Sequence, residues 1–157
     1  MSDITERSET HATFVIERDY PVAVGAVWHA LSDNDARDEW FGGGEAFDVH
    51  EKSHDFRVGG NGIEDGQWHD GPTSRFVSTY TDIVEQQRMV FVYDMWVDDR
   101  HISTSLTTIA VEPSGQGTRL TYTEQGVHLD GLDSVEGREE GTAGLLDNLG
   151  SFLVRGR

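Results

Sequence analysis

The chain has 157 residues, a mass of 17.5 kDa and 36% hydrophobic residues, which fits one globular domain with one core. Acidic side chains number 29 against 12 basic ones, the formal net charge is -17, and Lys52 is the only lysine. A surface with this much negative charge repels the phosphate backbone of nucleic acids and the head groups of anionic lipids, which argues against nucleic-acid partners. A salt-tolerant or high-GC host is the simpler explanation of the charge. Without cysteine, the chain has no disulfide, thiolate nucleophile or cysteine-based metal site.

Residues 1–10 are polar, and we expect them to form a flexible N-terminus before a single domain that spans residues 11–157. The apolar runs, such as residues 89–93, are too short to cross a bilayer, and the first residues lack a basic flank followed by an apolar run. We therefore expect a soluble, cytoplasmic protein without membrane insertion.

The first elements are a strand and two short helices. Residues 12–18 (ATFVIER) are rich in β-branched and aromatic residues and predict a first strand. A short helix is predicted after Pro21, because apolar residues recur at i, i+3, i+4 and i+7: Val24, Val27, Trp28 and Leu31. Ser32 and Asp33 close this helix, and Asp33 can cap a second one in the stretch DNDARDEWF.

The stretch EWFGGG places Trp40 and Phe41 directly before three glycines. Glycine adopts backbone angles that other residues avoid, so the chain can turn sharply here while both aromatic rings stay buried.

From Glu45 onward the pattern predicts six further strands: EAFDVHE, HDFRV, SRFVSTYTDIVE, RMVFVYDMW, HISTSLTTIAVE and TRLTYTEQG. We interpret the glycine-containing stretch NGIEDGQWHDGP, residues 61–72, as turns, and residues 127–132 as a connector. Because the breaks between strands have hairpin length, the sheet is predicted to be antiparallel.

The last segment, residues 133–154, is predicted to be a helix. Leu145, Leu149 and Phe152 share one face at i, i+4 and i+7, with Leu146 and Leu153 beside them. The predicted fold is α+β: a curved seven-stranded antiparallel sheet wraps around this helix, and the two short helices follow strand 1. Room for a cavity is expected between the helix and the sheet.

Several ordered motifs resemble one known family: YPVAVGAVWHALSD, EWFGGG, FRVGG, YTDIVEQQRMVFVY and EEGTAGLLDNLGSFL. They are similar to those of bacterial homologues of the activator of the heat-shock-ninety ATPase, in the START-like (SRPBCC) superfamily. The resemblance covers residues 12–154 and implies a helix-grip fold around an apolar cavity. The superfamily includes lipid carriers, hormone receptors and aromatase/cyclases, so the fold does not fix the function.

The resemblance also implies that Trp40 and Phe41 contribute to the cavity wall. The chain departs from the family at two positions. Relatives often carry Gly-Trp where this chain has Gly141 and Thr142, which is expected to enlarge or hydrate the cavity. Many relatives carry His where this chain has Glu124, which is expected to put a carboxylate at the cavity edge.

The predicted ligand contacts are aromatic and aliphatic side chains with a few polar ones, as in most small-molecule sites. They are Trp40, Phe41, Phe56, Trp68, Phe91, Tyr93, Trp96, Ser105, Thr107, Tyr122, Glu124, Leu145 and Leu149. Ordinary core packing is the alternative for Phe91, Leu145 and Leu149. In HISTSLTTIAVE each face of the strand is half hydroxyl, so we expect a pocket with a polar end.

Glu124 is the candidate acid-base residue. In TRLTYTEQG, Leu120, Tyr122 and Glu124 form the face that is predicted to point inward. Burial would disfavour the ionised carboxylate, which is the usual preparation for a general acid or base. The alternative is a solvent-exposed glutamate at the strand end.

The histidines do not form a recognisable metal motif. His50 and His54 lie four apart across a strand end, and no HExxH motif accompanies them, so we expect neither a metal nor a cofactor. Aspartates neighbour His69 and His101 and could orient their rings for proton transfer, although both histidines also fit surface loops.

Three functions remain open at this stage. The first is a non-catalytic START-like domain that binds a small or medium hydrophobic ligand, such as a lipid, a sterol or a polyketide-like molecule. The second, suggested by the resemblance, is a chaperone-ATPase-activator-like interaction module with an exposed apolar patch. The third is a cyclase- or hydrolase-like enzyme that uses Glu124 or a histidine. Members of the superfamily often pair, so monomer and homodimer both remain open.

Overall fold

The computed structural model describes residues 6–155, so residues 1–5 of the predicted flexible terminus lie outside the described residues. The elements, in chain order, are β1 (Glu9–Tyr20), α1 (Val24–Ser32), α2 (Asn34–Asp38), the short 3-10 helix η1 (Gly44–Ala46), β2 (Phe47–His54), β3 (Asn61–Trp68), β4 (Thr73–Val84), β5 (Arg88–Val97), β6 (Arg100–Ser114), β7 (Gly117–Leu129) and α3 (Val135–Arg155).

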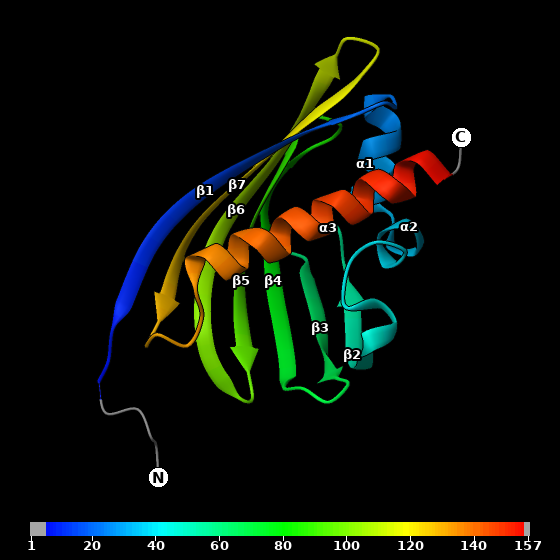
Figure 1. Ribbon diagram of the computed structural model, residues 1–157. Coiled ribbons are helices and arrows are strands. Elements are labelled where there is room, and N and C mark those ends of the chain that lie inside the picture. Colours follow the sequence, from blue (N-terminus) through cyan, green and yellow to red (C-terminus); the bar gives the residue numbers. More distant parts are fainter. Residues whose placement is uncertain (1–5, 156–157) are drawn as a thin grey trace.

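The strands form one antiparallel sheet in the order β1-β7-β6-β5-β4-β3-β2. Figure 1 shows the curved sheet with α3 running diagonally across its concave face, while α1 and α2 close one end. The predicted helix-grip α+β fold is therefore confirmed. Because β1 and β2 are the two edges, β6, β5 and β4 form the centre of the sheet, and β7 lies between β6 and the edge strand β1.

The first and last strands are longer than the sequence pattern predicts. β1 pairs with β7 along its whole length, from Glu9 opposite Leu129 to Tyr20 opposite Thr118. The predicted connector over residues 127–132 therefore belongs partly to β7. Backbone hydrogen bonds between the paired strands continue beyond the apolar residues from which each strand was predicted, so each strand is longer.

The buried face of α3 is a stripe at i, i+4, i+7 and i+11: Thr142, Leu146, Leu149 and Leu153. The predicted face is slightly rotated, because Leu145 and Phe152 lie half-buried at the edges of this stripe. The adjacent apolar pairs Leu145–Leu146 and Phe152–Leu153 fit either face, and only the packing decides between them. Among residues 6–155, no helix combines the length and the apolar character that a membrane span requires.

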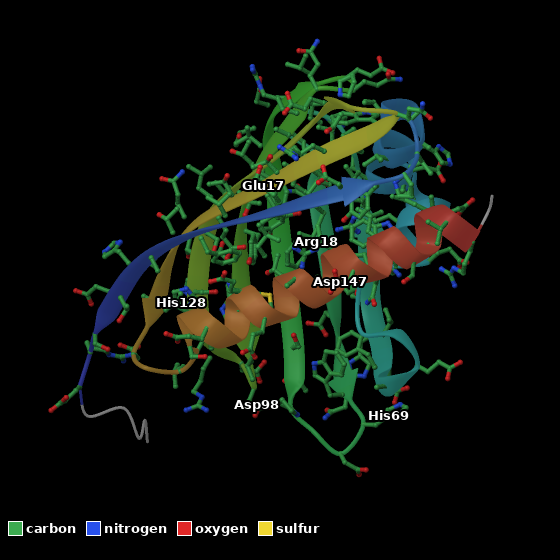
Figure 2. The ribbon with its side chains drawn as sticks, turned by 45° about the horizontal axis from the view of Figure 1, so that its top comes forward. Glu17, Arg18, His69, Asp98, His128 and Asp147 are labelled. Atoms are coloured by element: carbon green, nitrogen blue, oxygen red, sulfur yellow. The ribbon has the colours of Figure 1, made fainter. Side chains whose placement is uncertain are left out.

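Two polar contacts hold α3 against the edge strand β1. The Tyr20 hydroxyl donates to the backbone oxygen of Leu146 over 2.7 Å. Arg18 Nε lies 3.0 Å from Asp147 Oδ1, and Figure 2 shows these two side chains facing each other between the strand and the helix.

The third predicted strand is wrong. Of the stretch HDFRV only His54 is in a strand, and the stretch over residues 61–68 that we interpreted as turns forms β3. Its glycines Gly62 and Gly66 occur where a neighbouring strand comes close. A Cβ atom at Gly66 would lie 2.7 Å from the ring of Phe47, and one at Gly62 would lie 2.7 Å from Ser78 Oγ. Glycine here allows close packing within a strand rather than a turn.

The short helices and the aromatic-glycine turn follow the prediction. Asp33 caps α2, because its Oδ2 accepts from the backbone N–H of Ala36 over 3.1 Å. Gly42 has a φ of 101°, a left-handed conformation that favours glycine. Trp40 is buried before the turn, and its indole N–H donates to the backbone oxygen of Ala30 over 2.8 Å.

Candidate ligand-binding site

The inner face of β6 changes from polar to apolar along the strand. Its buried residues are Ser103, Ser105, Thr107, Ile109 and Val111. The opposite face is more exposed, and its Leu106 is 40% exposed. The strand alternation therefore gives the concave face a hydroxyl-rich end and an apolar end, which agrees with the predicted polar end of a pocket.

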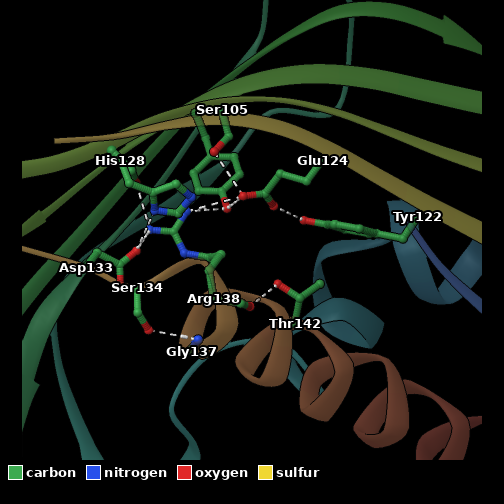
Figure 3. A network of polar contacts seen from close by, with 11 residues as sticks. Ser105, Tyr122, Glu124, His128, Asp133, Ser134, Gly137, Arg138 and Thr142 are labelled. Carbon is green, nitrogen blue, oxygen red and sulfur yellow. Dashed lines mark hydrogen bonds and ion pairs between the residues drawn. The ribbon is translucent and has the colours of Figure 1, made fainter. Parts of the chain in front are cut away.

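Glu124 lies on the neighbouring strand β7, opposite Thr107 of β6, and is only 1% exposed. Its Oε2 accepts from the hydroxyl groups of Tyr93 (2.8 Å) and Ser105 (2.9 Å), and its Oε1 accepts from Tyr122 (2.9 Å). Arg138 Nη1 lies 3.3 Å from Oε2 (Figure 3). The alternative of an exposed strand-end glutamate is wrong, because Tyr122 and Glu124 both alternate inward on β7.

Arg138 comes from the first turns of α3 and joins the helix to the sheet. Its Nη2 donates to Ser103 Oγ over 2.7 Å and to Asp133 Oδ2 over 2.8 Å. The same Asp133 oxygen lies 3.2 Å from Nδ1 of the buried His128. The polar network of Figure 3 therefore links α3, the loop before it and the inner faces of β5, β6 and β7.

The pKa shifts in this network indicate neutral phenols around a charged guanidinium. Burial raises the pKa of Tyr93, and the charge of Glu124 raises it further; burial also raises the pKa of Tyr122 well above its usual value. Burial acts to lower the pKa of Arg138, but Tyr93, Asp133 and Glu124 outweigh it, so this pKa is raised. Both tyrosines can therefore donate to the carboxylate.

Thr107 stands beside this network with an unused hydroxyl group. It is buried, it pairs across the strands with Phe91 and Glu124, and its Oγ1 lies near the Tyr122 hydroxyl without forming a hydrogen bond of good geometry to any described residue. A buried hydroxyl without a partner costs free energy. It is therefore a group that a ligand's polar atom could satisfy.

Aromatic side chains form a continuous set, which we call the aromatic arc. Neighbouring ring centroids lie 4.9 to 6.1 Å apart along the series Trp28, Phe56, Tyr80, Phe91, Tyr93, Phe76, Phe41 and Trp40. The arc brings together five of the predicted contacts: Trp40, Phe41, Phe56, Phe91 and Tyr93. Four of its rings stay half-buried: Phe41, Phe56, Phe76 and Phe91.

Two predicted contacts lie away from the arc. Trp68 is 38% exposed and packs on Phe47 at the end of β3, with ring centroids 4.9 Å apart. Trp96 stacks on His101, which is bonded to Asp94, a residue on the outer face of β5. Trp96 is therefore placed on the convex side of the sheet. Leu149 is fully buried in the core, where ordinary packing explains it.

Two pockets lie at the rim of the sheet. One, of about 350 Å³, is bordered by the α1–α2 junction and residues 54–56. The other, of about 500 Å³, lies between residues 15–18 of β1 and α3, where Glu136, Glu139 and Glu140 border it. Phe56 borders the first pocket and also belongs to the arc.

The histidines have local partners. His54 bonds to Asn34 Oδ1 through Nδ1 and to the hydroxyl of Tyr80 through Nε2. His69 lies in the exposed turn after β3, with its Nε2 2.9 Å from Asp48 Oδ1 (Figure 2). In the part of the chain that the structure describes, no group of three or more His, Asp or Glu could hold a metal ion.

Sequence reasoning missed Arg138, although a signal for it exists. Arg138 lies four residues before Thr142 and so continues the buried stripe of α3 toward its N-terminus. It also missed Phe76 and Tyr80, which lie on the inner face of β4 by strand alternation. Arg37 and Glu64, both buried, carry no comparable signal, since charged residues are ordinarily taken as exposed.

The family model for "Activator of Hsp90 ATPase homolog 1-like protein" matches residues 21–153. The chain belongs to this family. Protein Mll3558 from Rhizobium loti is 46% identical, covers 92% of this chain and 99% of its own, and has a TM-score of 0.86. An uncharacterised protein from Rhizobium leguminosarum is 38% identical, with 96% and 99% covered and a TM-score of 0.91.

A more distant structure shares the fold alone. DynU16, a protein of the dynemicin biosynthetic locus, is 17% identical, and the match covers 92% of this chain and 48% of DynU16 with a TM-score of 0.65. No curated protein matches the chain.

Proposed function

We propose that this START-like domain binds a small or medium-sized hydrophobic molecule on the concave face of its sheet, beneath α3. The ligand is a lipid, a sterol or a polyketide-like molecule that carries at least one polar atom. Its apolar body packs against the aromatic arc, and its polar atom meets the hydroxyl-rich end of β6.

One observation carries this proposal: large apolar rings on the inner side of the fold remain half-buried. Phe41, Phe56, Phe76 and Phe91 are consecutive or near neighbours in the arc, and part of each side chain remains accessible. Fully burying a phenylalanine side chain contributes about 1.5–3 kcal/mol, so covering the rest of several rings supplies useful binding free energy.

Thr107 supports the polar part of the proposal. Its buried, unpartnered hydroxyl group lies across the strands from Phe91, a ring of the arc. A ligand hydroxyl or carbonyl would replace the missing hydrogen bond without disturbing Glu124, whose oxygens already accept from neighbouring side chains.

The test uses tryptophan fluorescence in a variant that reports on the arc. Trp68→Phe and Trp96→Phe together remove the tryptophans outside the arc and leave Trp28 and Trp40, which contact Phe56 and Phe41. A lysophospholipid, a sterol and a polycyclic aromatic ketone represent the three classes. We expect one of them to change the fluorescence saturably and to raise the melting temperature.

The size of the thermal shift can be anticipated. A ligand at 100 times its Kd stabilises the folded state by about 2.7 kcal/mol, which corresponds to several degrees for a domain of this size. Silence of both signals with all three classes, up to their solubility limits, would contradict the proposed function.

A further inference from the structure

Arg37 is a buried cation at the α2 end of the aromatic arc. It lies in the last turn of α2, is 9% exposed, and its guanidinium carbon sits 3.8 Å above the centroid of the Phe41 ring. Phe41 packs edge-on against Phe76, so the stacked guanidinium is continuous with the arc. Its charge interacts with Tyr80 and Glu64 on the inner faces of β4 and β3.

The guanidinium has no partner of its own in the part of the chain that the structure describes. No carboxylate oxygen there lies within 4.0 Å of it, and it donates no hydrogen bond to the described residues. The nearby carboxylates face Lys52 instead: Asp38 Oδ1 lies 2.9 Å and Glu64 Oε1 3.5 Å from its Nζ. Burial consequently lowers the pKa of Arg37, because nothing adjacent stabilises its charge fully.

The neighbouring polar side chains do not fill this role. His54 and Tyr80 bond to each other over 2.6 Å, and the other ring nitrogen of His54 bonds to Asn34. Burial, followed by the charge of Arg37, lowers the pKa of His54 to about 4, so the ring is neutral at pH 7. Stacking on Phe41 uses the face of the guanidinium and leaves its N–H edges free, in the planar geometry that matches a carboxylate.

We propose that Arg37 receives the carboxylate of a hydrophobic carboxylic acid whose apolar body lies along the aromatic arc. This inference rests on the proposed function and narrows its ligand class from hydrophobic molecules in general to hydrophobic acids. Glu64 adds a second preference. Its Oε1 is buried and accepts no hydrogen bond from the described residues, although Lys52 Nζ lies 3.5 Å away, so a hydroxyl group next to the carboxylate finds an acceptor there.

The test compares two ligands that differ only in the head group, dodecanoate and dodecanol, at pH 7.5 and below micelle formation. Binding is followed by fluorescence in the Trp68→Phe, Trp96→Phe background. A hydrogen bond to a charged group contributes more free energy than a neutral one. The parent should therefore bind dodecanoate at least about tenfold more tightly than dodecanol.

Arg37→Met keeps the length and the contact with Phe41 but removes the charge. We expect it to lose the preference for the acid while its affinity for dodecanol stays within about twofold. Arg75→Met is the matched control, since it removes one positive charge from the outer face, where Arg75 pairs with Glu51 and Asp65. This control should keep the full preference.

The outcomes are distinct. A parent protein that binds both ligands equally, or an Arg37→Met variant that keeps the preference, overturns the role of Arg37 and leaves the proposed function standing. Failure of the parent to bind either ligand overturns this inference, while the proposed function is contradicted only by silence with all three ligand classes. The comparison of the two ligands on the parent alone remains decisive if Arg37→Met does not fold.

Discussion

Arg138 Nη1 lies 3.3 Å from Glu124 Oε2, and this buried ion pair connects the first turns of α3 to the centre of β7. Asp133, which also contacts Arg138, and the hydroxyl groups of Tyr93, Tyr122, Ser103 and Ser105 complete the surroundings of the pair. A buried pair of this kind positions the helix over the sheet and thereby sets the space that remains above the arc.

Removing one member of the pair should destabilise the protein strongly. Glu124→Gln leaves Arg138 with Asp133 as its remaining carboxylate, so we expect the free energy of unfolding to fall by about 2–4 kcal/mol. Glu112→Gln, at an exposed position of β6, is the control and should change it by less than about 0.5 kcal/mol. Chemical denaturation measures both, and a Glu124→Gln variant as stable as the parent would refute the structural role of the pair.

Thr107→Val tests the unpartnered hydroxyl group. Valine has nearly the same shape, so the ligand-free protein should gain about 1 kcal/mol in unfolding free energy, because a buried polar group without a partner is removed. The affinity for a ligand with a polar atom should fall by about three- to tenfold, the worth of one neutral hydrogen bond. Thr108→Val, on the opposite face of β6, should leave binding unchanged. A Thr107→Val variant with a lower unfolding free energy and unaltered ligand affinity would show that Thr107 is merely a core residue.

The stability of the protein should depend on His54 in mild acid. Burial and Arg37 lower the pKa of His54 from 6.5 to about 4 in the folded state. As the pH falls through this window, the unfolded chain binds a proton that the folded protein does not, so the unfolding free energy falls. Above pH 6.5 the contribution of neutral His54 to the unfolding free energy is fully present, and below about pH 4 this contribution is completely lost.

His54→Gln isolates this effect from the titration of the many carboxylates. The difference in unfolding free energy between the parent and His54→Gln should be largest at pH 7 and should shrink between pH 6.5 and 4. Denaturation at a series of pH values measures it. A constant difference over this range would contradict a buried neutral imidazole.

Gly141→Ala should stabilise the protein. Gly141 is an exposed residue inside α3, and a Cβ atom there meets no atom within 4 Å. Alanine should therefore raise the unfolding free energy by about 0.5–1 kcal/mol through helix propensity and a less flexible unfolded chain. Gly66→Ala is the opposite case, since its Cβ would collide with the Phe47 ring, and it should destabilise. Thermal melts that rank the two variants the other way would contradict the packing described for β3.

Much of the site follows from a local rule. Side chains alternate along a strand, and this alone places Tyr122 and Glu124 on one face of β7 and Ser105 and Thr107 on one face of β6. The same rule, applied from Tyr93, puts Trp96 on the outer face. The prediction of an aromatic pocket lining included five residues of the arc but also Trp68 and Trp96, which lie away from it, and it missed Phe76 and Tyr80.

The rest depends on contacts between distant segments. Glycines in a strand and glycines in a turn have the same sequence signal, and only the close approach of β2, through the Asp48 backbone oxygen and the Phe47 ring, distinguishes Gly66 in β3. Arg37 and Arg138 are charged helix residues that would ordinarily face water, and their burial is decided by rings and carboxylates from other elements. Glu124 was recognised as a candidate, but its partner across the fold lies on α3 and could not be identified from β7 alone.

The most direct test of the central claim is to map the bound ligand on the protein by NMR. Backbone amide shifts would be followed while the best ligand from the three classes is titrated. We predict that the largest saturable changes occur at the concave face, around Phe91 and Thr107, and along the facing residues of α3. Changes confined to the outer face near Trp96 and His101, or no saturable change at all, would contradict a binding site between α3 and the sheet.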